Sequence, residues 1–141
     1  MALAAIALML AYPAGTGAAP SQDFSSEVAS TLLQQLTQGF VTHNRRQALS
    51  VFEGARMKGY GQLRDEITSL FAQYESFRAA YRVRQSWPQG ERGVVLAEFD
   101  LEGTPLEEGS PPLRRSGQLR FQFERGRRGW RIVEVEPRTF F

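Results

Sequence analysis

Hydrophobic positions between residues 60 and 87 change their spacing part-way along, and this change organises the rest of the chain. From Tyr60 to Tyr74 the apolar residues lie three and four positions apart, which predicts one face of an α-helix. From Phe77 onward apolar residues alternate with others, several of them arginines, which predicts a strand with one buried face. No glycine or proline separates the two patterns. We therefore expect a helix that runs directly into a strand.

Two further helices are predicted upstream of this junction. An apolar stripe along residues 21–41 predicts the first helix, which should end at His43 and Asn44. Asn44, with Gln47 three residues later, is typical of the N-cap of a second, shorter helix. Gly54 is expected to stop that helix.

Three later segments alternate in the same way and predict strands, at residues 94–102, 118–124 and 130–135. A loop rich in proline and glycine, 103–112, separates the first two, and the turn 126–129 makes the last two a hairpin. The alternation slips in the final strand, where a β-bulge near Val133 would return Val135 to the buried face.

Charged residues occupy the polar faces of the predicted strands. Arginines lie on the first and third strands and acids on the second: Arg78, Arg82, Arg84 and Arg120 against Glu98, Asp100 and Glu102. Opposite charges on adjacent strands contribute roughly 0.2–1 kcal/mol per pair. We expect a solvent-facing sheet surface held by ion pairs.

The first 19 residues are apolar and end in small residues, which is typical of a secretory signal peptide cleaved near Ala19. They lack a positive n-region, which a misassigned start codon would explain. A retained membrane anchor is the alternative, although the apolar run is about half the length of a spanning helix. We therefore expect one exported domain, 20–141, that is periplasmic or secreted and does not span the membrane after cleavage.

The composition of the chain excludes several kinds of catalytic and metal site. The chain is 42% hydrophobic, enough for one core, and it has no cysteine, which excludes disulfides, thiolate catalysis and cysteine zinc sites. His43 is the only histidine, so one chain cannot build a multi-histidine metal site. We expect no metal and no cofactor. Export and the lack of a recognised motif argue against nucleic acid as a partner.

Several segments together resemble the nuclear transport factor 2-like superfamily, whose members include SnoaL-like and steroid-isomerase-like proteins; the subfamily stays open. They are the helix pair at 21–52, the 63–74 helix feeding the Phe77 strand, and 119–125 followed by the Gly-Trp-Arg-Ile of 129–132. The resemblance implies an α+β fold in which N-terminal helices pack in the concave face of a curved, mainly antiparallel four-stranded sheet. Such a cystatin-like cone has a pocket between helices and sheet.

The resemblance covers about residues 21–137. The short first strand pair of the family is either missing or lies within 54–60.

An enzyme of the steroid-isomerase type needs a carboxylate base and a proton donor inside the cone. The strand alternation places no acid on the inward face. Asp65 and His43 are the remaining candidates, against the alternatives of an exposed helix acid and a helix cap. We assign no catalytic residue.

Six aromatic residues are expected to line the pocket, unless they serve only to pack the core: Tyr60, Tyr74, Tyr81, Phe99, Phe121 and Trp130. The sequence therefore favours a non-catalytic domain of the cell envelope that binds a small apolar ligand or an envelope protein. A cofactor-free isomerase or lyase that uses the same pocket is the alternative. Leu96, apolar on a polar sheet face, suggests a homodimer.

Arginine supplies almost all of the positive charge, since Lys58 is the only lysine, and its planar group suits phosphate and carboxylate. A GC-rich genome would explain the same bias. The densest basic cluster is Arg125, Arg127, Arg128 and Arg131. It could meet an anionic surface or could be a solvated hairpin tip.

Overall fold

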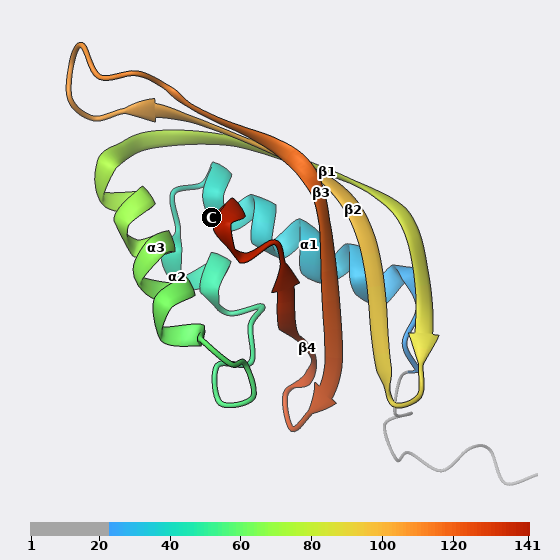
Figure 1. The fold of residues 1–141 in the computed structure, drawn as a ribbon. Helices are drawn as coiled ribbons and strands as arrows, with labels where there is room; N and C mark the ends of the chain where they lie inside the picture. The colour runs from blue at the N-terminus through green and yellow to red at the C-terminus, as the bar shows by residue number, and fades with distance from the viewer. Residues whose placement is uncertain (1–22) are drawn as a thin grey trace, which may run out of the picture.

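The computed structural model describes residues 23–141; the expected signal peptide, 1–19, lies outside the described residues. Helices come first and a sheet follows, in the order α1 (Ser26–Val41), α2 (Arg45–Leu49), α3 (Tyr60–Gln73), β1 (Tyr74–Gln89), β2 (Arg92–Pro105), β3 (Leu113–Gly126), β4 (Gly129–Glu136) and the short 3₁₀ helix η1 (Arg138–Phe140) (Figure 1).

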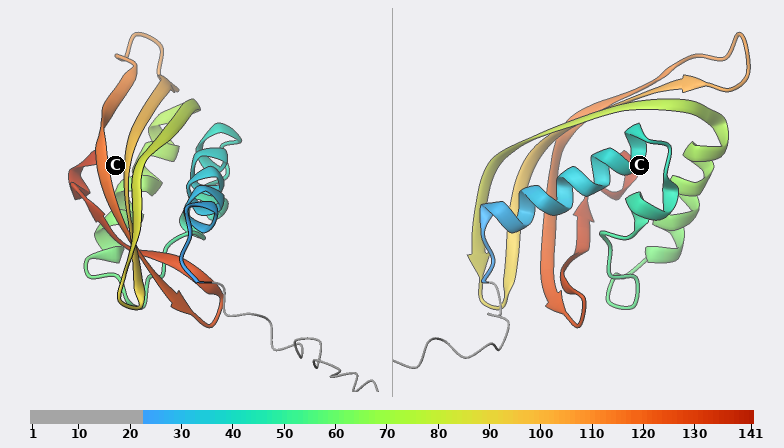
Figure 2. Two further views of the ribbon diagram at one scale, coloured as in Figure 1. Left: turned by 90° about the vertical axis from the view of Figure 1, so that its right-hand side faces the viewer. Right: turned by 180° about the vertical axis from the view of Figure 1, so that it is seen from behind.

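The four strands form one antiparallel sheet in the order β1-β2-β3-β4. The sheet is strongly bent, and all three α-helices lie on its concave side, as the rotated views of Figure 2 show. This confirms the α+β cone that the resemblance implies. In the part of the chain that the structure describes, no helix is long and apolar enough to cross a membrane.

The predicted helix-to-strand junction is confirmed. Gln73 is the last residue of α3, and Tyr74 already has extended backbone angles. The backbone N–H of Tyr74 still donates to the carbonyl of Leu70, so the final helical hydrogen bond and the first strand residue share one position. The chain therefore turns from helix to sheet without a loop, which fixes α3 against the start of β1.

The first helix begins later than predicted, at Ser26 rather than near residue 21. Ser25 is its N-cap, because the Ser25 hydroxyl accepts a hydrogen bond of 3.2 Å from the backbone N–H of Val28. Phe24 stays outside the helix, and its ring covers Gly93, where a Cβ atom would come within 2.1 Å of the ring.

The predicted cap of the second helix is confirmed, since the Asn44 side chain accepts from the backbone N–H of Gln47 at 3.1 Å. The helix ends at Leu49, not at Gly54. Gly39 of α1 lies against Ala48 so closely that a Cβ on Gly39 would be 2.4 Å from the Ala48 nitrogen. The two helices can cross at this distance only because Gly39 lacks a side chain.

The bulge predicted in the last strand is also confirmed. Ile132 pairs with Phe123 and Glu134 with Gln122, so Val133 is the extra residue. As a result Trp130, Ile132 and Val135 are all buried on the inner side with the core.

Of the two alternatives left open for the family's first strand pair, a strand within 54–60 is not observed, because these residues form turns and the start of α3. A single parallel bridge joins Phe52 to Ile132 instead, with hydrogen bonds of 2.9 Å from Glu53 N–H to the Ile132 carbonyl and 2.8 Å from Ile132 N–H to the Val51 carbonyl. β2 and β3 also extend further than predicted and shorten the loop between them to 106–112. Cross-strand pairing extends β2 through Gly103 and Pro105, which the sequence pattern assigns to a loop.

Ion pairs form on the outer sheet face, as expected, but they are fewer than the register allows. Glu98 contacts Arg82 at 3.4 Å and Arg84 at 2.6 Å. Arg78 lies opposite Glu102 in the register, yet no ion pair joins them among the described residues. These groups are well exposed, so the pairs contribute little to stability.

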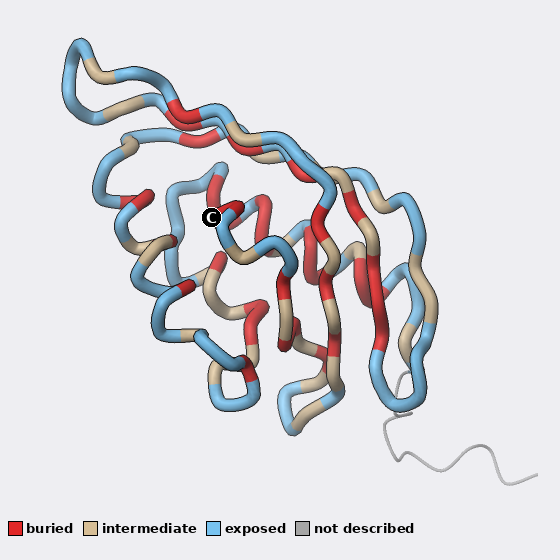
Figure 3. The backbone as a smooth tube through the Cα atoms, in the orientation of Figure 1, coloured by how far each residue is buried: buried red, intermediate tan, exposed pale blue. Residues whose placement is uncertain are grey.

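Buried residues cluster where the helices meet the sheet (Figure 3). Trp130 is 7% exposed, and its ring lies 5.3 Å from Phe24 in an edge-on arrangement. Phe24 also contacts Phe123, with the ring centroids 5.4 Å apart. The inward direction predicted for Trp130 is confirmed, and Phe24 is its aromatic neighbour.

We expect Trp130→Ala to lower the free energy of unfolding by about 3–5 kcal/mol, because it empties a buried site that Phe24 cannot fill. Exposed Arg127 in the adjacent turn is the control, and Arg127→Ala should cost less than about 0.5 kcal/mol. Denaturant melts of both variants measure the difference. Equal stability of the two variants would contradict the register of the β3–β4 hairpin.

Candidate functional site

The interior of the cone is filled by aromatic side chains. Phe99 and Phe121, two of the expected pocket residues, are 0% exposed and belong to the core. Phe40 of α1 contacts Phe71 of α3 and Phe77 of β1, with ring centroids 5.2 Å and 5.3 Å away. Helix and sheet therefore meet through rings at the place where the resemblance implies a pocket.

The last two residues complete this filling. Phe141 lies 5.8 Å from Phe40 and 5.7 Å from Phe99, measured between ring centroids, so its ring bridges α1 and β2. Phe140 packs edge-on against Phe99 at 5.6 Å. The Arg115 guanidinium holds the segment in place by donating a 2.6 Å hydrogen bond to the Phe140 carbonyl. Figure 1 places the end of the chain inside the curve of the sheet.

The two candidate acid–base residues lie outside this interior. His43 is exposed, and its Nε2 atom donates to the Tyr74 carbonyl at 2.9 Å while its ring packs on Phe71. Asp65 has a side chain 73% exposed and pairs with Arg64 at 3.3 Å. His43 thus tethers the end of α1 to the α3–β1 junction, and Asp65 faces solvent.

Thr37 is the only buried polar residue in the described part of the chain, and its hydroxyl is satisfied by the Gln34 carbonyl at 2.9 Å. Nor do residues 23–141 contain a cluster of three His, Cys, Asp or Glu side chains able to hold a metal ion. The filled interior therefore offers neither a carboxylate nor an imidazole to a reacting atom.

Tyr81 is half-buried at the inner face of β1. Its hydroxyl donates to the Ser30 carbonyl of α1 at 3.1 Å, which ties the helix to the sheet. Of the six expected pocket residues, Tyr74 lines one hollow open to solvent and Tyr60 lines a different one. The structure therefore does not bring the six together around one cavity, and a ligand-binding role for them stays a prediction.

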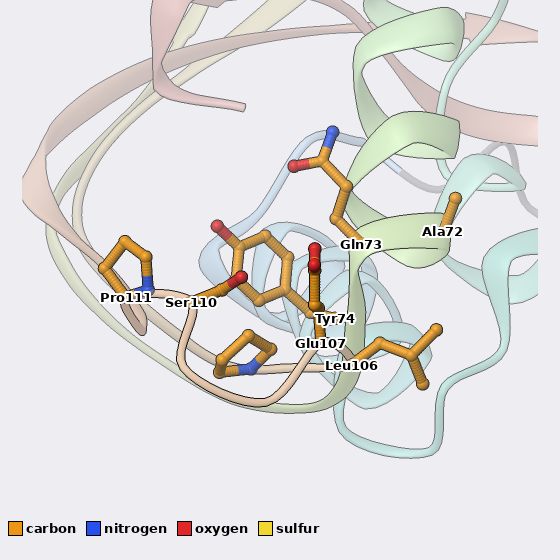
Figure 4. A pocket seen from close by; sticks show the side chains of 8 residues that line it. Ala72, Gln73, Tyr74, Leu106, Glu107, Ser110 and Pro111 are labelled. Atoms are coloured by element: carbon orange, nitrogen blue, oxygen red, sulfur yellow. The ribbon is translucent and has the colours of Figure 1, made fainter.

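Tyr74 lines a hollow of about 590 Å³ between the end of α3 and the loop after β2 (Figure 4). The loop is anchored there by a 2.9 Å hydrogen bond from the Leu106 N–H to the Gln73 carbonyl. Leu106 itself is 65% exposed. Figure 4 shows Tyr74 among Glu107, Ser110 and Pro111 of that loop. Glu107 is the one charged residue in the described lining of this hollow.

Tyr60 lines a second hollow, of about 760 Å³, beside α2. Its ring lies against Gly54, where a Cβ would be 2.7 Å from the ring carbon Cδ1. Arg128 reaches this hollow from the β3–β4 turn and contacts Glu53 at 3.6 Å. Arg45 and Arg46 of α2 line it as well. We refer to it as the basic hollow.

The four arginines of the predicted basic cluster in the last hairpin do not act as one group. Arg125 lies over the Trp130 ring at 5.7 Å, and Arg131 donates a 2.7 Å hydrogen bond to the Trp130 carbonyl. Arg128 instead lines the basic hollow together with Arg45 and Arg46 of α2, which the sequence analysis does not single out. The consecutive arginines were visible in the sequence, but nothing local indicated that Arg128, far away in the chain, would meet them.

Two carboxylates touch on β4. A hydrogen bond between Glu134 and Glu136 raises the pKa of Glu134, and partial burial and the charge of Glu136 act in the same direction. Nearby Arg138 and Arg120 oppose this rise without cancelling it. The pair therefore holds a proton more strongly in the folded chain than two separated glutamates would.

No protein-family model matches the chain, and no similar curated protein was found. Among solved structures, a nuclear transport factor 2-like superfamily protein from Salmonella enterica aligns with a TM-score of 0.66 and 11% identity, over 77% of this chain and 86% of its own. A proposed scytalone dehydratase from Novosphingobium aromaticivorans gives a TM-score of 0.67 and 7% identity, over 78% and 80%.

A domain of unknown function with a cystatin-like fold from Nostoc punctiforme aligns with a TM-score of 0.61 and 11% identity, over 78% of this chain and 74% of its own. The chain has the nuclear transport factor 2-like fold. At these identities the likeness concerns the fold alone, because proteins that share this fold differ in function. What distinguishes this chain from others with the same fold must come from its own side chains.

Glu134→Gln should make the stability of the chain less dependent on pH. Because the folded pKa of Glu134 is raised, the folded state binds more protons than the unfolded state above about pH 4.3, and stability falls as pH rises through the raised value. Glutamine keeps a donor for Glu136 and removes one negative charge. We expect little change at pH 4 and higher stability than the parent at pH 7.

Denaturant melts at the two pH values measure this effect, with Glu108→Gln in the exposed 106–112 loop as the control. A loss of stability at pH 7 in Glu134→Gln would mean that Arg120 and Arg138, rather than Glu136, dominate the surroundings of Glu134.

Proposed function

We propose that this chain is a non-catalytic binding domain that acts in the cell envelope. The observation that carries the proposal is the filled cone, in which Phe140 and Phe141 occupy the space between α1 and the sheet. Acid–base catalysis needs a proton-transferring group within hydrogen-bond reach of the substrate. Among residues 23–141, the buried side chains are apolar apart from one threonine, whose hydroxyl is hydrogen-bonded.

The placement of the polar groups supports the same proposal. The Nε2–H group of His43 donates a hydrogen bond to a backbone carbonyl, and Asp65 forms an exposed ion pair with Arg64. Neither residue is among the described residues that line the hollow at Tyr74 or the basic hollow. The open hollows lie on the outside of the cone, at the α3–β1 junction and beside α2. Recognition at the surface therefore fits this arrangement better than chemistry inside it.

The proposed dehydratase among the structural neighbours makes a cofactor-free lyase or isomerase the function to test against. That alternative requires an apolar substrate to displace Phe141, and His43 or Asp65 to turn inward. Export is the other part of the proposal, and the apolar stretch 1–19 supports it. Pairing of two copies through the outer sheet face at Leu96 stays a prediction.

The test uses protein recovered from outside the cytoplasmic membrane. The mass of the recovered protein shows whether residues 1–19 have been removed, and proton exchange measures its activity. Enolisable ketones are incubated with this chain in D₂O, and loss of the α-proton signal is followed by NMR. We expect exchange at the rate of buffer alone, because no base reaches the substrate. Exchange that is faster than in buffer would contradict the non-catalytic proposal, and its loss in His43→Gln or Asp65→Asn would identify the base. Recovery of the intact, uncleaved chain only from the cytoplasm would contradict export.

A further inference from the structure

The basic hollow combines positive charge with an apolar floor. Its described lining consists of Arg45, Arg46, Leu49, Ser50, Phe52, Glu53, Gly54, Ala55, Tyr60 and Arg128. Three arginines against one glutamate leave a net charge of +2. A volume of about 760 Å³ falls in the range of small-molecule sites, about 300–1,000 Å³.

The two α2 arginines have no carboxylate partner among residues 23–141, and both are exposed. They are the first two residues of α2, a position where positive charge does not stabilise a helix. Arg128 contacts Glu53 only at 3.6 Å, with its side chain 61% exposed. All three guanidinium groups can therefore turn toward an anion in the hollow without breaking a strong interaction.

The floor of the hollow is rigid. Phe52 is buried and held by the bridge to Ile132, so its backbone cannot shift without disturbing β4. Tyr60 begins α3 and is fixed by the contact of its ring with Gly54. Its hydroxyl has no hydrogen-bond partner in the described part of the chain. The site thus offers a pre-positioned donor beside an apolar surface.

We propose that the basic hollow binds a small organic anion, with its carboxylate or phosphate group on Arg45, Arg46 and Arg128 and its alkyl or aromatic group on Leu49, Phe52 and Tyr60. This inference rests on the proposed function as a binding domain. Guanidinium groups bind both kinds of oxyanion through paired N–H donors. The Tyr60 hydroxyl supplies a further hydrogen-bond donor at the boundary between the anionic group and the apolar group of the ligand.

The charge environment favours an anion here. Arg131, next to the hollow, has its pKa lowered chiefly by burial and next by the positive charge of Arg128, while Glu53 acts in the opposite direction. At Arg131 the positive charge of Arg128 therefore outweighs the negative charge of Glu53. A bound anion would offset this repulsion, which a neutral ligand would leave in place.

Calorimetry of the purified chain tests the inference with octanoate and octyl phosphate as probes. Acetate and inorganic phosphate are controls that carry the anionic group without the octyl chain. The third control, 1-octanol, carries the octyl chain without the negative charge. We expect both octyl anions to bind about ten-fold or more tightly than any of these three controls. Equal affinity for 1-octanol, or for inorganic phosphate, would overturn the inference, since it requires charge and apolar contact together.

Variants locate the site. Arg45→Gln combined with Arg46→Gln should weaken octanoate binding about ten-fold or more, and Tyr60→Phe should weaken it a few-fold. Arg78→Gln combined with Arg114→Gln is the matched control, because it removes the same charge from the outer sheet face. That control should bind octanoate as the parent does. Equal losses in the two double variants, or no loss in the α2 variant, would overturn the inference.

The two proposals fail in different ways. Octanoate binding by a chain that also accelerates proton exchange would contradict the non-catalytic function and leave the basic hollow supported. A chain that neither binds the octyl anions nor accelerates exchange would overturn the basic hollow and leave the non-catalytic function standing.

Discussion

The ring of Phe141 packs between Phe40 of α1 and Phe99 of β2, and the rest of the structure depends on this contact. A sheet bent as strongly as this one leaves a wide space between its concave face and the helices, and protein interiors do not tolerate empty space of that size. In this chain the space is closed by its own phenylalanines, contributed by α1, α3, β1, β2 and η1. In residues 23–141 the space inside the cone is therefore occupied by a packed aromatic core.

Because the core is packed with apolar side chains, the polar and charged side chains of residues 23–141, apart from Thr37, lie at the surface. His43, which could have been a base at the mouth of the cone, caps the aromatic cluster by stacking on Phe77 and bonding the Tyr74 carbonyl. The strands direct charged side chains to the outer face, where Glu98 and Glu124 each contact two arginines. The two hollows described above lie on the outside of the cone, one at the α3–β1 junction and one where the loop after α2 meets the last hairpin.

Much of the fold could be predicted from local pattern, since a change of hydrophobic period marks a helix and a strand wherever one face is buried. The bulge at Val133 followed from the same logic, because the alternation slips where the extra residue is inserted. The position of Phe140 and Phe141 could not be predicted in this way. They follow Pro137 with no periodic pattern of their own, and only tertiary packing decides that they turn inward.

The candidate site was less predictable for a related reason. The basic hollow brings α2, Tyr60 and Arg128 together through the bridge between Phe52 and Ile132, a single parallel contact without an alternating pattern. Likewise, treating inward-facing aromatics as pocket residues assumed an open cone. Parity shows which way Phe99 and Phe121 point, but it does not show whether another part of the chain covers them.

The most direct measurement of the filled cone is the set of nuclear Overhauser contacts made by the last two aromatic rings in solution. We expect cross-peaks from the Phe141 ring to Phe40 and Phe99 and from Phe140 to Phe99, with ring protons shifted by the neighbouring aromatic faces. Phe140 and Phe141 signals at the positions of free phenylalanine, without contacts to α1 or β2, would contradict the account. They would show an open cone.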